Sequence, residues 1–281
     1  MSRTLVLNSS NYVVGLGNKF VYRLPNTIKM EAGSTIGLSG ISIFNSTFNV
    51  EKVRGNNTVF LTWLGTVYTI VFEDGYYSIS DLNFRIQQFC ILNNLYLTAN
   101  SGSNVLYYVE LAINSVRYSV QLNLYTIPTE AQATALGYSK PSGAIWSFPA
   151  TQSTPLLEFN QAFGNLIGQT FGKFPLTVQT STQIFLSTQS PQISPVNSYI
   201  LTCNMLNSKY SIPSNTFFTL PLSAALGNLQ VINPSSVVMN HISPQIYSEI
   251  VITFYDQNFN ALRLNDTEVT ITLAIQEALS V

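Results

Sequence analysis

The chain has 281 residues, with 12 Lys and Arg, 13 Asp and Glu, and a formal net charge of −1. Charged residues make up 9% of the sequence, against about 25% in an ordinary soluble domain. The hydrophobic fraction of 46% excludes a disordered chain, and the lack of a basic cluster argues against specific nucleic-acid binding. Most of the surface must be uncharged, and we expect other subunits to cover part of it, because near-zero net charge favours association.

Neither a secretory leader nor a membrane span is expected. The first ten residues lack the long apolar core of a signal peptide. The longest charge-free stretch, residues 174–208, contains three prolines and many Gln, Ser and Thr, whereas a span needs about 20 apolar residues. The two cysteines, Cys90 and Cys203, form no disulfide framework, which is usual in a reducing compartment.

Alternating apolar and polar residues predict strands along most of the chain. The first strand covers residues 19–24, and Pro25 is expected to end it. In residues 35–44 the apolar positions change parity after Leu38. We interpret Ser39-Gly40 as a β-bulge that turns the following apolar residues inward again.

Two further strands, at residues 58–63 and 66–72, are joined at Leu64-Gly65. A turn is predicted at Glu73-Asp74-Gly75, because Asp-Gly accepts positive φ. The pattern of residues 105–126 predicts a hairpin with a two-residue turn at Asn114-Ser115.

Only one helix has a convincing pattern. Ser80 is expected to cap it, Asp81 lies in its first turn, and Asn93-Asn94 ends it. Its apolar face carries Leu82, Ile86, Phe89 and Cys90. Residues 129–174 are irregular and are interpreted as long loops with a short helix near 156–166.

Later strands are predicted at residues 183–187, 198–206, 216–220, 250–254 and 269–275. About eleven strands with one helix indicate an all-β antiparallel sandwich, and eight of them make a jelly roll. We therefore predict a single jelly roll over residues 1–281, with one short helix and an inserted β-hairpin and loop region around 75–150. The alternative is two small β-domains divided near residues 129–151.

The chemistry of catalysis is nearly absent. His241 is the only histidine and is expected at a loop or rim. A Cys–His nucleophile pair would need Cys90 or Cys203 beside it, but both lie in apolar runs and are expected to be inert buried thiols. Asp256, Asp266 and Glu268 flank the last connection, where they are either solvated acids or a calcium site.

No catalytic, cofactor or metal-binding residue is therefore assigned, and the chain is not expected to be an enzyme. The enzyme alternative is a β-sandwich hydrolase that uses Asp256 and Glu268, and neither the pairing of carboxylates nor the position of the histidine supports it.

Three stretches resemble segments of capsid proteins of virophages and polinton-like viruses. They are residues 74–88 (DGYYSISDLNFRIQQ), 189–198 (QSPQISPVNS) and 254–260 (FYDQNFN). The major capsid proteins of that group are about twice as long as this chain, so its length selects the penton, or minor capsid, protein. Before Asp74 only generic jelly-roll patterning is recognisable.

The resemblance implies a single jelly roll that forms homopentamers at the five-fold vertices of an icosahedral shell, beside a major capsid protein of the double-jelly-roll type. It also implies location in the virion, with assembly inside the host cell, and it supplies no catalytic residues. The second hypothesis is a β-sandwich that recognises a glycan or host receptor, with Trp63 and Trp146 as candidate stacking residues.

Charge is distributed unevenly along the chain. From residue 174 to residue 248 the only charged residue is Lys209. Charged residues are depleted in the centres of interfaces, so we expect this stretch to supply much of the contact between subunits.

Overall fold

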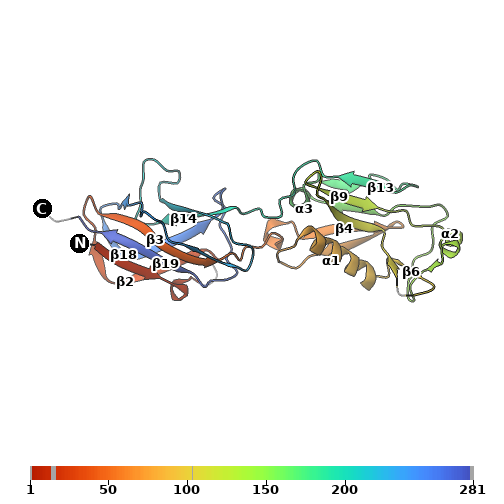
Figure 1. Ribbon diagram of the computed structural model, residues 1–281, viewed down its shortest axis with the longest axis horizontal. Helices are drawn as coiled ribbons and strands as arrows, with labels where there is room; N and C mark the ends of the chain where they lie inside the picture. Colours follow the sequence, from red (N-terminus) through yellow and green to blue (C-terminus); the bar gives the residue numbers. More distant parts are fainter. Residues whose placement is uncertain (1, 14–16, 103, 279–281) are drawn as a thin grey trace. The chain divides into compact units, whose positions relative to one another are not determined.

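The computed structural model describes residues 2–13, 17–102 and 104–278, and it divides into two compact units. The first unit combines Met1–Thr47 with Val196–Val281, and the second is Phe48–Pro195. Strands account for 41% of the chain and helices for 12%, which confirms the predicted all-β class. Figure 1 shows both units as layers of antiparallel strands.

The first unit consists of two sheets. Sheet 1 has the order β1-β19-β3-β16, with the short β17 also paired to β3, and sheet 2 has the order β15-β14-β18-β2. Their strands are β1 (Ser2–Leu7), β2 (Lys19–Lys29), β3 (Thr35–Phe44), β14 (Ser198–Cys203), β15 (Thr216–Pro221), β16 (Leu229–Ile232), β17 (Asn240–His241), β18 (Ile246–Tyr255) and β19 (Thr270–Gln276). A 3-10 helix, η1 (Ser9–Asn11), follows β1.

The connections between these strands define a jelly roll. The chain passes from β1 in sheet 1 to β2 in sheet 2 and back to β3, then forms the β14–β15 hairpin in sheet 2 before β16 returns to sheet 1. The last two strands, β18 and β19, lie in the middle of sheets 2 and 1. This wrapping of two antiparallel sheets is the predicted jelly roll, and the second unit is inserted between β3 and β14.

The bulge predicted at Ser39-Gly40 is confirmed. Thr272 pairs with Gly40 and Leu273 with Leu38, so Ser39 has no partner in the ladder. The extra residue changes the parity of β3, and Ile36, Leu38, Ile41 and Ile43 are all buried in the core of the first unit. One strand thereby contributes apolar side chains on both sides of its bend.

Pro25 does not end β2, contrary to the prediction. The strand continues to Lys29 because β2 lies at the edge of sheet 2, where a residue without an N–H is tolerated. Its pairing with β18 is interrupted instead: Tyr247 lies opposite Ile28, and Glu249 opposite Arg23. Residues 24–27 of β2 therefore bulge opposite Ser248 alone.

The second unit has a core of its own. Its sheets have the orders β12-β11-β4-β5, β13-β9-β8 and β10-β6-β7. The strands are β4 (Thr58–Trp63), β5 (Thr66–Val71), β6 (Leu97–Ala99), β7 (Val105–Leu106), β8 (Val109–Asn114), β9 (Ser119–Leu124), β10 (Tyr138–Ser139), β11 (Leu156–Phe159), β12 (Gly172–Phe174) and β13 (Gln183–Leu186). The region expected as an insertion, around 75–150, lies inside this unit, and neither boundary of the unit falls within residues 129–151.

The described residues contain three α-helices, where the sequence predicted one convincing helix. These are α1 (Ile79–Leu92), α2 (Glu130–Ala135) and α3 (Gln161–Ile167), and a 3-10 helix, η2 (Lys52–Arg54), lies at the start of the unit. The N-cap of α1 is Ser78, not Ser80: the Ser78 hydroxyl accepts from the Asp81 N–H at 3.1 Å. As predicted, the helix ends at Asn93, and Asn94 has a positive φ.

The irregular region predicted at residues 129–174 has more structure than expected. It contains α2, β10, β11, α3 and β12, with the expected short helix displaced to Gln161–Ile167 by the strand β11 before it. The turn at Leu64-Gly65 is confirmed, and both residues have positive φ.

The β8–β9 hairpin has a longer loop than predicted. Asn114 pairs with Ser119, so residues 115–118 form the loop, and the predicted two-residue turn at Asn114-Ser115 is wrong. The Asn114 carboxamide accepts from the Arg117 N–H at 3.2 Å, which favours the wider turn. Val116 and Tyr118 are consequently exposed instead of being in the strand.

Candidate assembly surface

Both cysteines are buried, as the sequence predicted for inert thiols. Cys90 lies on the inner face of α1 and Cys203 at the end of β14, in the cores of different units. Burial raises the pKa of each thiol to about 12, so neither forms a thiolate near neutral pH. His241 lies in β17, where it pairs with Thr35 and is exposed.

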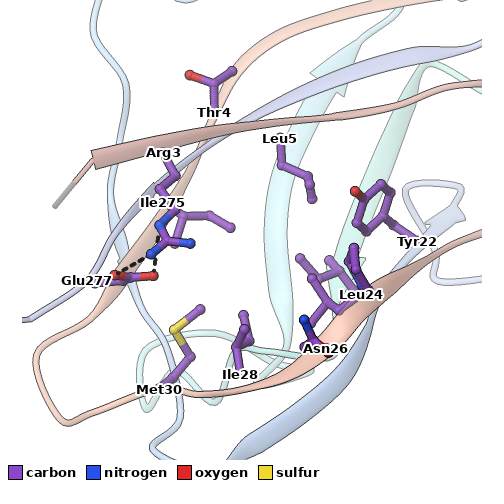
Figure 2. Close-up of a pocket in the computed structure, with 12 residues that line it drawn as sticks. Arg3, Thr4, Leu5, Tyr22, Leu24, Asn26, Ile28, Met30, Ile275 and Glu277 are labelled. Carbon is purple, nitrogen blue, oxygen red and sulfur yellow. Dashed lines mark hydrogen bonds and ion pairs between the residues drawn. The ribbon is translucent and has the colours of Figure 1, made fainter.

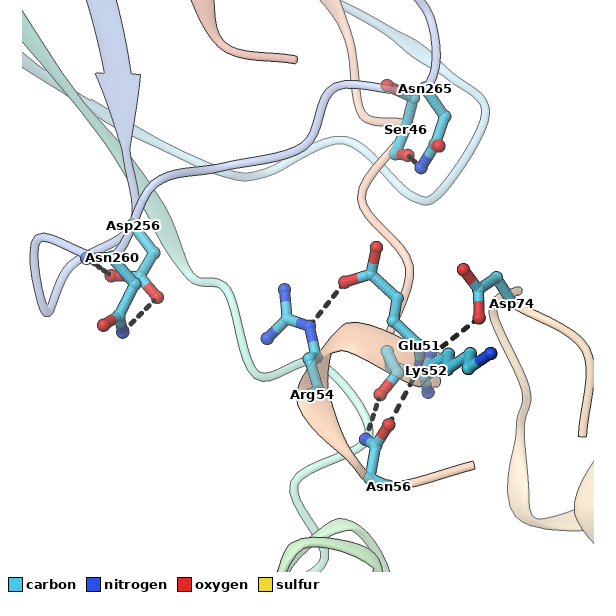
Figure 3. Close-up of polar contacts among 10 residues, drawn as sticks. Ser46, Glu51, Lys52, Arg54, Asn56, Asp74, Asp256, Asn260 and Asn265 are labelled. Atoms are coloured by element: carbon cyan, nitrogen blue, oxygen red, sulfur yellow. Dashed lines mark hydrogen bonds and ion pairs between the residues drawn. The ribbon is translucent and has the colours of Figure 1, made fainter. Parts of the chain in front are cut away.

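The three acids of the last connection do not form a shared site. The Asp256 carboxylate accepts from the backbone N–H groups of Asn258 and Asn260 at 2.8 and 2.9 Å and so closes its own turn. Figure 3 shows its contact with Asn260. Asp266 accepts from the Glu268 N–H at 2.9 Å. Among the described residues no three His, Cys, Asp or Glu side chains are grouped as metal ligands, so the calcium hypothesis gains no support.

Acids at the start of the second unit also have structural partners. Glu51, which the sequence did not single out, is buried and pairs with Arg54 at 2.6 Å (Figure 3). The Asp74 carboxylate accepts from the Lys52 N–H at 2.7 Å. Gly75 forms a bridge to Val50 without the positive φ that the Asp-Gly pattern predicted. Glu51 and Asp74 therefore hold the ends of their loops in position, which is a structural role.

A further polar cluster joins β8 to Tyr125, which directly follows β9. The Glu110 carboxylate accepts from the Tyr125 hydroxyl at 2.6 Å and from the Asn123 amide at 2.9 Å. The hydrogen bond to Glu110 raises the pKa of Tyr125 to about 12. Both donors to this carboxylate are neutral side chains of the same unit, so the cluster is a structural contact.

The two tryptophans are packed inside the second unit and are not stacking platforms. Trp63 is 1% exposed and Trp146 8% exposed. Their rings meet edge to face with centroids 5.4 Å apart. The glycan hypothesis named these two residues as its aromatic candidates, and burial removes both from contact with a sugar.

The two sheets of the jelly roll differ in how many charged residues their strands carry. Arg3 is the only Lys, Arg, Asp or Glu within the described strands of sheet 1, and it pairs with Glu277 at 3.1 Å. The strands of sheet 2 carry Lys19, Arg23, Lys29 and Glu249. Sheet 1 therefore has an uncharged outer face.

The uncharged outer face is defined by the outward residues of four strands. Val231 lies opposite Ser42, and Ser42 opposite Thr270. In the same way Val6 lies opposite Thr272, and Leu229 opposite Phe44. Val6, Leu229 and Val231 are 47%, 47% and 55% exposed. Another protein can pack against this row of polar and apolar side chains without burying an unpaired charge.

The charge-poor stretch, residues 174–248, is distributed over both units. Residues 174–195 belong to the second unit and residues 196–248 to the first. In the first unit it supplies the edge strand β16 and the β14–β15 connection, where Tyr210 is 100% and Ile212 94% exposed. Val6 and Phe44 lie outside this stretch, and only the pairing of distant strands places them on the same face as Val231.

Comparison with known proteins gives structural neighbours only. No protein-family model matches the sequence, and no curated protein matches it. Among the solved structures that match are two virophage proteins. One is the mavirus penton protein, which has a TM-score of 0.44, 11% identity and coverage of 99% of both chains.

A second is a chain of the Sputnik virophage structure, with a TM-score of 0.41, 10% identity, and coverage of 99% of this chain and 97% of that one. Both neighbours are of the viral group that the three sequence stretches resemble. None of the described helices has the length and hydropathy that crossing a membrane requires.

Proposed function

We propose that this chain is a structural capsid protein, a penton that forms homopentamers at the five-fold vertices of an icosahedral shell. The observation that carries the proposal is the uncharged outer face of sheet 1 on a single jelly roll. The three sequence stretches that resemble virophage capsid segments agree with it. Its partner in the shell would be a major capsid protein of the double-jelly-roll type, and its location the virion vertex, reached by assembly inside the host cell.

The mechanism is physical assembly with no chemical step. In a ring, the outer face of sheet 1 of one copy contacts a different surface of the next copy, and such heterologous contacts close when the rotation between neighbours permits. Charged groups are costly to remove from water without partners, whereas Val231, Thr272 and Phe44 can be buried at no such cost. The face is therefore suited to a large lateral contact.

The test is the mass of the purified full chain by light scattering, followed by electron micrographs scored for five-fold rings. We expect a five-subunit particle, present from the start or formed on concentration. Mixing with the double-jelly-roll capsid protein should then yield closed shells that contain this chain. A protein that stays monomeric at every concentration and never joins such shells would refute the proposal.

A further inference from the structure

A pocket of about 300 Å³ lies in the first unit between the edges of the two sheets. Its walls are mostly apolar and include Leu5, Tyr22, Leu24, Ile28, Met30 and Ile275. Figure 2 shows these side chains converging from β1, β2 and β19 and from Met30, which directly follows β2. Ile250 of β18, which is fully buried, also lines it.

The bulge in β2 explains why the sheets part here. Four residues of β2, at positions 24–27, lie opposite the single residue Ser248 of β18, so the edge strand leaves the ladder. Pro25 has no N–H to restore a hydrogen bond within it. Leu5, Tyr22, Leu24 and Ile28 are consequently only partly buried, although they pack against the core.

The mouth of the pocket is electrically balanced. Arg3 continues the inward row of β1 beyond Leu7 and Leu5, and its guanidinium meets the Glu277 carboxylate through both oxygens, at 3.1 and 3.4 Å. These are the only charged residues among those that line the pocket, and the Asn26 amide is a further polar group there (Figure 2). An incoming carboxylate or ammonium would have to compete with this ion pair.

Apolar walls with a neutral polar mouth specify the chemistry of a ligand. Ligand pockets begin at about 300 Å³ and are mostly apolar with a few placed polar groups. An alkyl chain would remove the part-exposed side chains from water, a gain proportional to the apolar area covered. A neutral polar end could reach Asn26 or the outer atoms of the Arg3–Glu277 pair without breaking it.

We propose that this pocket binds the alkyl chain of a small, uncharged, single-chain amphiphile such as a medium-chain alcohol, with its hydroxyl at the Arg3–Glu277 pair. The bound chain ties the edge strands β1 and β2 together and stabilises the jelly roll. The site belongs to one copy of the chain and does not depend on the capsid assembly proposed above.

The direct test titrates the full chain with 1-decanol, decanoate and decyltrimethylammonium by calorimetry, each below its solubility or micelle limit. We expect saturable binding of decanol with a negative heat-capacity change, a higher melting temperature of the first unit, and weaker binding of both ions by about tenfold or more. Absence of saturable decanol binding, or equal binding of all three, overturns the proposal.

Two neighbouring residues of β1 provide a matched pair of variants. Leu5→Trp places an indole in the pocket, whereas Val6→Trp adds the same group on the outer face of sheet 1. We expect decanol affinity to fall about tenfold or more in the first variant and to be unchanged in the second. Should Leu5→Trp fail to fold by circular dichroism, Ile28→Trp blocks the same space from β2. Equal affinity in the blocked and control variants contradicts the site.

The ion pair gives a test of ligand charge. Glu277→Gln removes the carboxylate that balances Arg3 and leaves a cation at the mouth. We expect this variant to prefer decanoate over decanol, a reversal that nonspecific adsorption to apolar surface does not produce. An unchanged preference would show that the alkyl chain does not lie with its polar end at Arg3.

Discussion

Trp146 lies edge-on to Trp63, with ring centroids 5.4 Å apart, and its indole N–H donates to the Asn94 carbonyl oxygen at 2.6 Å. The Lys140 ammonium donates to the Trp146 carbonyl oxygen at 3.0 Å and lies 5.5 Å from the centre of the indole ring. The Trp146 side chain therefore anchors the irregular segment after α2 to the core of the second unit. This role explains why a tryptophan in a loop that contains Pro and Gly is buried.

The first prediction concerns this anchor. Trp146→Ala should lower the free energy of unfolding of the second unit by about 3–5 kcal/mol, because it removes a large buried side chain and leaves a cavity. Both tryptophans lie in this unit, so the fluorescence of Trp63 during urea unfolding measures the change. The neighbouring Ile145→Ala, at a 92% exposed position, is the control and should have almost no effect. Unchanged stability of Trp146→Ala would show that the loop is not anchored here.

The second prediction concerns the uncharged outer face of sheet 1. Val231→Glu places a carboxylate there at a 55% exposed position, and it should leave the monomer folded but reduce pentamer formation about tenfold or more. Val67→Glu makes the same change at a 61% exposed position of β5, outside residues 174–248, and should assemble normally. Light scattering against concentration compares the two. Equal tolerance of both charges would remove this face from the subunit contact.

The third prediction concerns the first turn of α1. Hydrogen bonds from the Ser78 hydroxyl and backbone N–H, at 2.6 and 2.9 Å, lower the pKa of Asp81. Ionised Asp81 therefore stabilises the fold above its unfolded pKa of about 3.9, and this contribution is lost as pH falls through the lower folded value. The stability difference between wild type and Asp81→Ala should be present at pH 7 and vanish in acid.

Ser78→Ala removes the hydroxyl that caps the same turn and should cost about 1 kcal/mol at pH 7. Ser80→Ala is its control, because Ser80 lies within the helix and does not cap it. Urea unfolding followed by tryptophan fluorescence measures both. A larger loss for Ser80→Ala than for Ser78→Ala would contradict the assignment of the cap.

Local patterns in the sequence predicted local structure well. The parity change in residues 35–44 predicted the bulge at Ser39, because each buried position of a strand must alternate unless a residue is inserted. Ser78 and the acidic Asp81 three residues later have the spacing of a capping box, which favours Ser78 over Ser80 as the N-cap of α1. The predicted turn of the β8–β9 hairpin was too short because Val116 and Tyr118 continue the apolar alternation of the strands in the sequence. In the structure both residues lie in the loop, which the Asn114 carboxamide stabilises.

The pairing of strands that are distant in the sequence could not be predicted from local patterns. The second unit is inserted between β3 and β14, and the partners of β3 in sheet 1 are β16 and β19, which follow the whole insertion in the sequence. The uncharged outer face combines β1, β3, β16 and β19 in the same way. The scarcity of charge in residues 174–248 pointed to β16, but no local pattern places Val6 or Phe44 beside it.

The fourth prediction concerns the two thiols. Because burial raises the pKa of Cys90 and of Cys203 to about 12, neither should react with a disulfide reagent at pH 8 while its unit is folded. In Cys203→Ser the remaining Cys90 reports opening of the second unit, and in Cys90→Ser the remaining Cys203 reports opening of the first. Rapid reaction of either thiol in the folded protein, before any loss of circular dichroism, would contradict the buried placement.

The fifth prediction concerns Gly37 of β3, whose outward side is covered by residues 237–239. A Cβ at this position would overlap the Val237 side chain and would lie 2.8 Å from both the Met239 sulfur and the Val238 carbonyl oxygen. Gly37→Ala should therefore push this segment from sheet 1 and cost about 1–3 kcal/mol. Reaction of Cys203 in the Cys90→Ser background, measured against urea concentration, reports the loss in the first unit.

A second substitution separates overlap from an intrinsic effect of alanine in a strand. Combining Gly37→Ala with Val237→Ala removes the nearest obstacle, so the pair should be less destabilised than the sum of the two single variants. The Val238 carbonyl is backbone and remains, so recovery should be incomplete. If the losses in free energy of unfolding of the two single variants simply add in the double variant, residues 237–239 do not pack on Gly37 and do not cover this part of the outer face of sheet 1.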